Sequence, residues 1–138
     1  MADLAVTATS VLPGTGTVVT GTLGGTVTAG QLVRLNTSNQ YVAAQSTSAA
    51  NSQMAGVALT GGAINQPVSV QTTGTYTAGG TVLVGKVYIV SATAGGIAPV
   101  DDVAGGEFIR VFGVGTSATI IQMIDAPYTG VAAAGAVA

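Results

Sequence analysis

The acidic residues are the first place to look for chemistry in this chain. Asp101 and Asp102 are adjacent, and Glu107 follows five residues later in a segment that comes after Pro99. Paired carboxylates can divide the acid and base roles of glycoside hydrolysis, or they can share a hard cation such as calcium. Adjacent acids between two strands usually hydrate a turn, and we interpret them in that way. The sequence therefore predicts neither a catalytic site nor a metal site at these acids.

The side chains on which most enzymes rely are missing. The 138 residues include no histidine and no cysteine, so the commonest general base, the commonest nitrogen ligand and the thiol nucleophile are all absent. The glycine-rich segment 14–16 lacks the lysine and hydroxyl residue of a phosphate-binding loop. We expect no catalytic residues, no cofactor and no metal, and we expect that the protein is not an enzyme.

Charge is scarce along the whole chain. Only 6% of the residues are charged, and the net charge is -2, whereas about a quarter of the residues of an ordinary soluble domain are charged. Three scattered cations cannot neutralise a row of phosphates, and no apolar run reaches the roughly 18 residues of a membrane span. We therefore expect no direct binding to nucleic acid and no membrane insertion. Such a surface is expected to be covered in an assembly or hydrated by neutral hydroxyl and amide groups.

Valine, threonine and glycine are abundant, and the segments between glycines are short, which favours β-structure over helix. Candidate strands lie at residues 18–23, 31–35, 41–43, 56–60, 67–72, 82–91, 108–113 and 116–124. Within 67–72, Val68 and Val70 alternate with Ser69 and Gln71, as in a half-buried strand. Residues 41–54 are the only stretch of helical composition, but their dense hydroxyl and amide side chains favour a loop. The sequence predicts an all-β fold, a compact sandwich or barrel of about eight to ten short, mostly antiparallel strands with extended terminal arms.

The two ends differ from the middle of the chain. Residues 1–17 are small, apolar and hydroxylated, and residues 130–138 contain only glycine, alanine and valine. We expect an extended amino-terminal arm (1–17), a β-domain (18–129) and a flexible or docking carboxy-terminal tail (130–138). The apolar residues of the amino-terminal arm favour docking on a partner. An acid near the start, in place of the basic residues of a secretory signal, favours synthesis in the cytoplasm.

A faint internal similarity divides the chain in two. Residues 25–33 align with 80–88, and residues 56–58 resemble 113–115. Two related halves would explain these matches, and so would chance matching between glycine-bounded hairpins in a chain rich in valine and threonine.

Threonines also recur two residues apart, at positions 15 and 17, 20 and 22, 26 and 28, and 73, 75 and 77. Such pairs project from one face of a strand. They are either the hydroxyl array of a stacked solenoid, as in ice-binding proteins, or ordinary β-forming residues on exposed faces.

Six residues are candidate contacts with a partner: four large apolar residues of the arm and two arginines within apolar strands. They are Leu4, Val6, Val11, Leu12, Arg34 and Arg110. A guanidinium within an apolar strand needs an acid or a carbonyl as its partner. Each arginine is therefore either an edge residue or the donor of a salt bridge to another subunit.

Five segments in order carry a resemblance to a known family. They are Val27 to Leu35, Ala55 to Leu59, Asn65 to Gly74, Leu83 to Ser91 with Gly95-Gly96-Ile97, and Arg110 to Gly115. Together they span about residues 24–124, and the chain resembles the capsid cement, or head decoration, proteins of tailed double-stranded DNA phages.

The resemblance implies a small all-β structural protein of the virion, made in the host cytoplasm and added to the outside of the expanded head. Its implied partners are the major capsid protein, whose neighbouring subunits it clamps, and itself as a homotrimer. The family has no catalytic residues to carry over. The alternative function is a β-module on a virion or cell surface that binds a receptor or glycan through its hydroxyl- and amide-rich loops.

Overall fold

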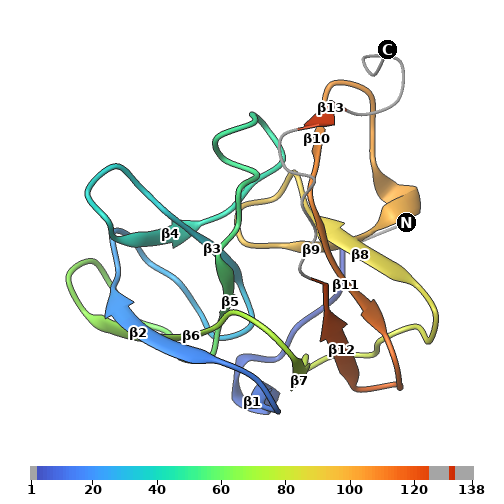
Figure 1. Cartoon of the computed structure of the whole chain (residues 1–138), viewed down its shortest axis with the longest axis horizontal. Coiled ribbons are helices and arrows are strands. Elements are labelled where there is room, and N and C mark those ends of the chain that lie inside the picture. Colours follow the sequence, from blue (N-terminus) through green and yellow to red (C-terminus); the bar gives the residue numbers. More distant parts are fainter. Residues whose placement is uncertain (1–2, 125–130, 133–138) are drawn as a thin grey trace.

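The computed structural model describes residues 3–124 and the backbone of the short strand Val131–Ala132. These residues form two antiparallel sheets packed together, which confirms the predicted all-β fold (Figure 1). The first sheet contains, in spatial order, β2 (Val18–Thr22), β6 (Pro67–Gln71), β5 (Gly56–Ala58), β3 (Leu32–Leu35) and β4 (Tyr41–Ala43). The second contains β1 (Leu12–Pro13), β7 (Thr75–Thr77), β12 (Ile120–Met123), β11 (Val111–Gly115), β8 (Val87–Val90) and β9 (Ile97–Pro99).

The remaining elements are short. Strands β10 (Phe108–Ile109) and β13 (Val131–Ala132) form a separate antiparallel pair, and single 3-10 turns occur at η1 (Ala8–Ser10) and η2 (Val100–Asp102). The strands are therefore shorter and more numerous than the sequence predicted. Apart from the pairing of β13, the predicted tail 130–138 lies outside the described residues.

Two strand predictions need correction. The segment 82–91 was expected to be the longest strand, but only Val87–Val90 is a strand, because Gly85 takes a left-handed φ of 79° and turns the chain. The strand at 67–72 was expected to be half-buried, but Gln71 is fully buried together with Val68 and Val70. Residues 44–54 form turns rather than a helix, as predicted.

The internal similarity is a repeat of the fold. The first half comprises β2, β3, β4, β5 and β6, and the second half comprises β7, β8, β9, β11 and β12. In each sheet the first of these five strands lies beside the fifth, and the fourth, the second and the third follow in spatial order. The ladder pairs also correspond: Val33 opposite Gly56 in the first half matches Tyr88 opposite Gly113 in the second. Before the second strand of each half, a glycine with positive φ donates its N–H to the fourth strand, Gly30 to Ala58 O at 2.7 Å and Gly85 to Gly115 O at 2.8 Å. The structure thus favours two related halves over chance.

One antiparallel ribbon joins the two sheets. Leu12 faces Thr77 and Val18 faces Gln71, so the ladder of residues 12–13 with 76–77 and the ladder of 18–22 with 67–71 share one register. At the crossing, Thr75 N donates to Thr15 O at 2.9 Å and the two threonine hydroxyl oxygens lie 3.0 Å apart. Several of the threonine pairs therefore belong to this ribbon, and the two-sheet topology is not that of a solenoid.

Gln71 holds the crossing from inside. Its Nε2 donates to Thr73 O at 2.9 Å and to Thr75 O at 2.7 Å, while its Oε1 accepts from Gly14 N at 3.3 Å. A buried amide is tolerated only when its donors and acceptors are paired, and here they pair with backbone groups on both strands of the ribbon. Gln71 therefore fixes how the two sheets are joined.

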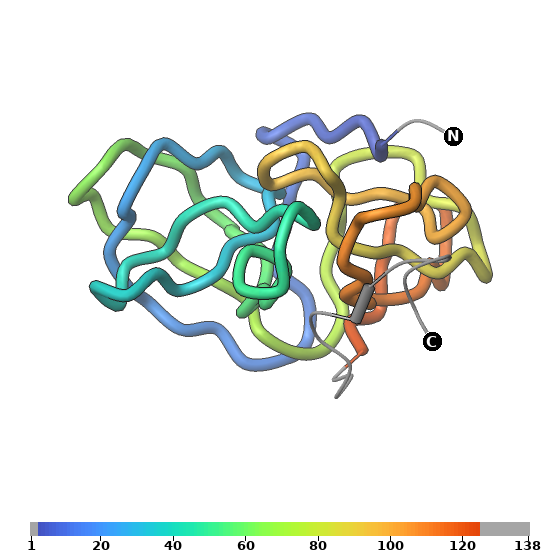
Figure 2. The backbone as a smooth tube through the Cα atoms, turned by 90° about the horizontal axis from the view of Figure 1, so that it is seen from above, coloured from blue at the N-terminus to red at the C-terminus, as the bar shows by residue number. Residues whose placement is uncertain are grey.

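Two hydrophobic cores fill the molecule. The smaller lies on one face of the first sheet and includes Leu23, Val33 and Val70. The larger combines Leu32 and other residues of the opposite face of that sheet with most buried side chains of the second. Figure 2 shows the two halves side by side, with the amino-terminal arm running over the second half. The first sheet is thus buried on both faces at its centre.

The two sheets are closed by different segments. In the first, an isolated parallel bridge between Leu23 and Tyr41, with Gly24 N donating to Tyr41 O at 2.8 Å, joins the two edges. In the second, the arm lies in the equivalent place: Leu4 N donates to Ile97 O and Thr7 N to Gly79 O, both at 2.8 Å. The arm was expected to lie on a partner, but its described part completes its own second sheet.

Candidate interaction surface

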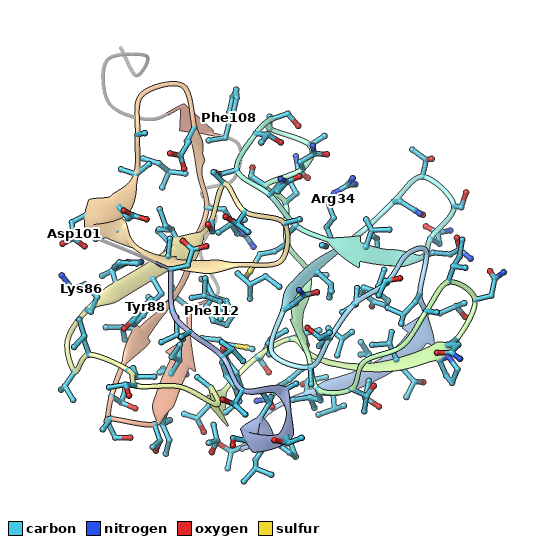
Figure 3. All side chains as sticks on the ribbon, turned by 180° about the vertical axis from the view of Figure 1, so that it is seen from behind. Arg34, Lys86, Tyr88, Asp101, Phe108 and Phe112 are labelled. Atoms are coloured by element: carbon cyan, nitrogen blue, oxygen red, sulfur yellow. The ribbon has the colours of Figure 1, made fainter. Side chains whose placement is uncertain are left out.

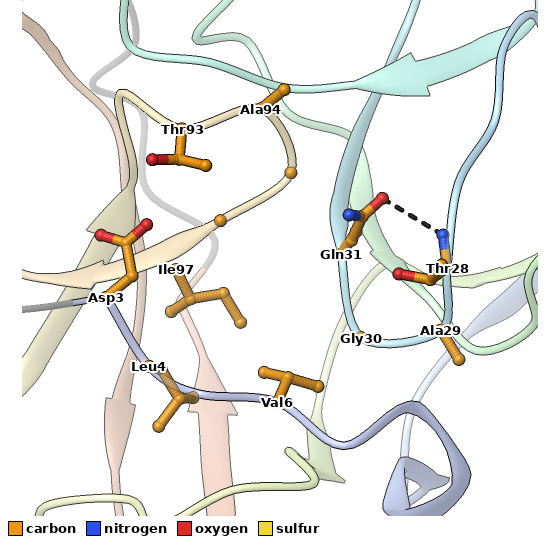
Figure 4. Close-up of a pocket in the computed structure, with 12 residues that line it drawn as sticks. Asp3, Leu4, Val6, Thr28, Ala29, Gly30, Gln31, Thr93, Ala94 and Ile97 are labelled. Carbon is orange, nitrogen blue, oxygen red and sulfur yellow. Dashed lines mark hydrogen bonds between the residues drawn. The ribbon is translucent and has the colours of Figure 1, made fainter.

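The structure places the predicted contact residues of the arm mostly inside the molecule. Val11 is buried in the larger core, and Leu4 and Val6 are partly buried against it. Figure 4 shows Leu4 and Val6 below Ile97, with Val6 directed toward the turn at Gly30. Leu12 is 56% exposed, and of these four apolar side chains it is the one that remains largely exposed to solvent. Leu4, Val6 and Val11 therefore attach the arm to its own chain.

The two predicted arginines come together although they are 76 positions apart in sequence. Arg34 on β3 and Arg110, between β10 and β11, line one surface groove of about 480 Å³, which we call the arginine groove. Its other walls come from the end of β3, the turn that follows it, and the loop before β5. They are Leu35, Asn36, Thr37, Ala50, Gln53, Met54 and Ala55. Both arginines were identified from the sequence, but their proximity could not be predicted. It depends on the tertiary fold, which also places the loop at 50–55 beside them.

The arginine groove is lined by two cationic side chains and by no acidic residue. Arg34 is partly exposed, yet its Nε is buried and has no hydrogen-bond partner. Arg110 already takes part in an interaction of its own. The groove therefore offers the positive charge of the partly exposed Arg34 to a negatively charged group.

The remaining cation is paired on another part of the surface. Lys86 Nζ lies 3.2 Å from Asp101 Oδ2, and Figure 3 shows this pair at the far side of the second half from Arg34. Desolvation pushes the pKa of Asp101 up, but the hydrogen bond and the charge of Lys86 outweigh it and hold the pKa below its ordinary value. Exposed pairs of this kind contribute little to stability.

The other acids hold loops in place. Glu107 accepts hydrogen bonds from Ser46 Oγ at 2.9 Å and from Ala104 N at 2.8 Å, one at each carboxylate oxygen. Asp3 accepts from Ser91 Oγ at 2.7 Å. Within residues 3–124, no three acidic side chains gather closely enough to hold a metal ion. Among the neighbouring acids of this region, Asp101 and Glu107 thus have structural hydrogen bonds.

Four of the aromatic residues are used for packing. Tyr41, Tyr76, Tyr88 and Phe112 are all buried, and Tyr76 meets Phe112 edge to face at 5.8 Å between ring centroids. The Tyr88 hydroxyl accepts a hydrogen bond from Leu83 N at 2.9 Å, whereas the Tyr76 hydroxyl is buried without a partner. These rings do not form an exposed stacking platform.

The chain matches no protein-family model and no curated protein. Within the described residues, no helix has the length and apolarity needed to cross a membrane. The arginine groove and the lightly charged surface around it are the features from which a function can be argued.

Proposed function

We propose that this protein is a structural component of a phage virion that binds the outside of the expanded head and cements neighbouring major capsid subunits. Its contacts would be mainly apolar and hydrogen-bonded, and it would act as a homotrimer. The proposal combines the sequence resemblance with a surface that carries few charges.

The observation that carries the proposal is the character of this surface. Only eight of the 138 residues are charged, and Lys86 and Asp101 neutralise each other. Within residues 3–124, eight large apolar side chains are exposed: Leu12, Val18, Leu35, Ile64, Leu83, Val84, Val100 and Ile124. Surfaces depleted in charge and supplied with exposed apolar groups are typical of the buried centres of protein interfaces.

Apolar adhesion suits a protein that must stay on a particle outside its host. Burial contributes about 25 cal/mol per Å² of apolar area, and added salt does not screen it as it screens pairs of exposed charges. Attachment at many sites of a lattice then raises the effective affinity through multivalency. Weak individual contacts would therefore be sufficient for stable decoration.

The test is co-sedimentation of the purified protein with expanded heads assembled from the major capsid protein of the same phage. We expect saturable binding whose dissociation constant changes less than about threefold between about 50 and 500 mM salt, because apolar contacts dominate. An absence of binding at both salt concentrations would contradict the proposal, and release over this range would contradict its apolar basis. Electron microscopy of the decorated particle would show whether the added density is trimeric.

The receptor- or glycan-binding alternative has less support. Sugar recognition commonly uses exposed aromatic faces beside polar groups, and the tyrosines at positions 41, 76 and 88 are each less than a tenth exposed. Binding to a glycan array that is abolished by changes in the hydroxyl-rich loops would favour this alternative instead.

A further inference from the structure

We propose that the arginine groove is a docking site for an acidic side chain of another protein, with Arg34 as the residue that binds the carboxylate. The proposal rests on the proposed function for the identity of that protein, which would be the major capsid protein. The groove itself and its chemistry are independent of that identity.

The first argument is the state of the Arg34 guanidinium. Arg34 is partly exposed at the wall of a groove of about 480 Å³, and none of the residues that line this groove is acidic. A guanidinium presents its donors as a fork that can bind both oxygens of a carboxylate. A carboxylate entering the groove would therefore bond to the accessible guanidinium nitrogens and neutralise the charge.

The second argument comes from the repeat. The ladder pair of Arg34 with Val42 in the first half corresponds to that of Ile89 with Ala98 in the second. Ile89 is 1% exposed and the next residue, Val90, is fully buried, whereas Leu35, which follows Arg34, is 46% exposed. The second half covers these positions with its own chain, so the first half leaves open a place that its counterpart fills.

The third argument identifies the source of the carboxylate. The acids at the described positions are already engaged: Asp3 with Ser91, Asp101 with Lys86, and Glu107 with Ser46. Asp102 also takes part in an interaction. A second copy of the chain would have to break one of these contacts to offer a carboxylate from this region, so a different protein is the favoured partner.

The walls of the groove specify what surrounds the acid. Leu35, Met54 and Ala55 supply apolar surface, and Asn36 and Gln53 supply amides near it. An apolar side chain next to the acid would cover Leu35 while the amides bond to the peptide backbone. The partner motif is therefore an aspartate or glutamate beside a large apolar residue.

The groove can be tested without any particle. The chain has only two arginines, so the Nε–H region of a 1H–15N spectrum contains two side-chain signals, and the variant Arg34→Lys identifies which belongs to Arg34. The probes are N-acetyl-Leu-Glu-amide and its uncharged match, N-acetyl-Leu-Gln-amide, at millimolar concentration. We expect a saturable shift of the Arg34 signal with the glutamate peptide only. No shift with either peptide, or equal shifts with both, would overturn the proposal.

The assembly test uses expanded heads and three variants of the full chain. Arg34→Gln should weaken binding by about thirtyfold or more, because the partner's carboxylate would be left buried and unpaired. Arg34→Lys should restore part of the affinity, since an ammonium keeps the charge but loses the fork. Lys86→Gln removes the same charge from the other side of the molecule, and it should change affinity by less than about twofold.

The outcomes separate this proposal from the proposed function. If the wild-type protein binds heads and Arg34→Gln binds equally well, the docking site is wrong and the cement function stands. Equal losses for Arg34→Gln and Lys86→Gln would indicate a long-range charge effect and would also overturn the site. If the wild-type protein does not bind heads but the peptide shift is observed, the proposed function fails and the carboxylate site stands. Thermal melting of each variant checks that it is folded, and the spectrum of the wild-type protein does not depend on any variant's stability.

Discussion

The two halves of the molecule share a strand order but close their sheets in different ways. The first half uses a local bridge in which Gly24 N donates to Tyr41 O. The second half uses the amino-terminal arm, which is placed between Ile97 and Gly79 and bonds to both. The corresponding edges of one repeated fold can thus be joined directly or through a segment more than 70 positions away in sequence. The second half should therefore depend on residues outside its own stretch of the chain.

Removal of residues 1–11 is expected to have the largest effect. It takes Val11 out of the larger core, exposes the surface covered by Leu4 and Val6, and removes the backbone bonds to Ile97 and Gly79. Burial of such side chains and the lost hydrogen bonds together predict a loss of about 4 kcal/mol or more in the free energy of unfolding. Urea denaturation measures this. Hydrogen exchange should speed up in β7 and β9 more than in β2 and β4, and equal acceleration in both halves would contradict the comparison.

Gln71→Leu should come next. The substitution leaves the carbonyls of Thr73 and Thr75 and the amide of Gly14 without their partner at the ribbon crossing. Unpaired buried backbone groups predict a destabilisation of about 3 kcal/mol. The control is Gln122→Leu in the second half, because Gln122 is only partly buried and its amide bonds to the adjacent Met123 O. A chemical denaturation curve for Gln71→Leu that coincides with the control would show that the crossing does not need this amide.

Gly80→Ala tests the arm's close approach with a smaller change. A Cβ at Gly80 would collide with the carbonyl oxygen of Ala5 in the arm, whereas a Cβ at the equivalent Gly25 would have no heavy atom within 4 Å. We expect Gly80→Ala to cost about 2 kcal/mol through overpacking and Gly25→Ala to stay within about 0.5 kcal/mol. Differential scanning calorimetry of the two variants measures this. Equal melting temperatures would mean that the arm does not lie where the structure places it.

Tyr76→Phe should have the smallest effect at neutral pH, and its sign is unusual. The Tyr76 hydroxyl is buried without a partner, so its removal should be neutral or stabilise the protein by up to about 1 kcal/mol. In contrast, Tyr88→Phe removes the acceptor of the Leu83 N–H and should cost about 1 kcal/mol. Urea denaturation at neutral pH distinguishes the two outcomes, and a clear loss of stability for Tyr76→Phe would reveal a hydrogen-bond partner.

The same tyrosine predicts an alkaline pH dependence. Burial raises the pKa of Tyr76 well above its ordinary value, so the native state keeps its proton where the unfolded chain has lost it. The stability that depends on this proton is complete below about pH 10 and falls above it by about 1.4 kcal/mol per pH unit. Tyr76→Phe should remove this part of the slope, which denaturation curves at several alkaline pH values would measure.

Much of the fold could be predicted from local pattern. The β-class and the loop at 44–54 follow from valine and threonine content and from loop-forming residues, which act within a few positions. The repeat was visible as an alignment of 25–33 with 80–88, but only the matched ladder pairs of Val33 and Tyr88 distinguish it from chance. The strand expected at 82–91 was too long because hydrophobic pattern does not report the positive φ of Gly85.

The candidate site could be predicted only in part. The two arginines were identified because a guanidinium in an apolar strand needs a partner, and the structure brings both to one groove. The inward direction of the arm's apolar residues could not be predicted, since an apolar segment gives the same signal whether it docks on its own chain or on another. Gln71 was assigned to a polar face because alternation describes a sheet with one buried face, and the first sheet is buried on both.

The amino-acid sequence by itself determined that this protein would be built of short strands, would lack the side chains of most enzyme chemistry and would carry few charges. Those properties depend on composition and on neighbours a few residues apart. Only the tertiary structure decided which segment closes each sheet, which polar side chain is buried at the crossing, and that the two arginines line one groove. These outcomes depend on contacts between residues that are tens of positions apart, and no local pattern records which distant partner a backbone edge or a side chain will find.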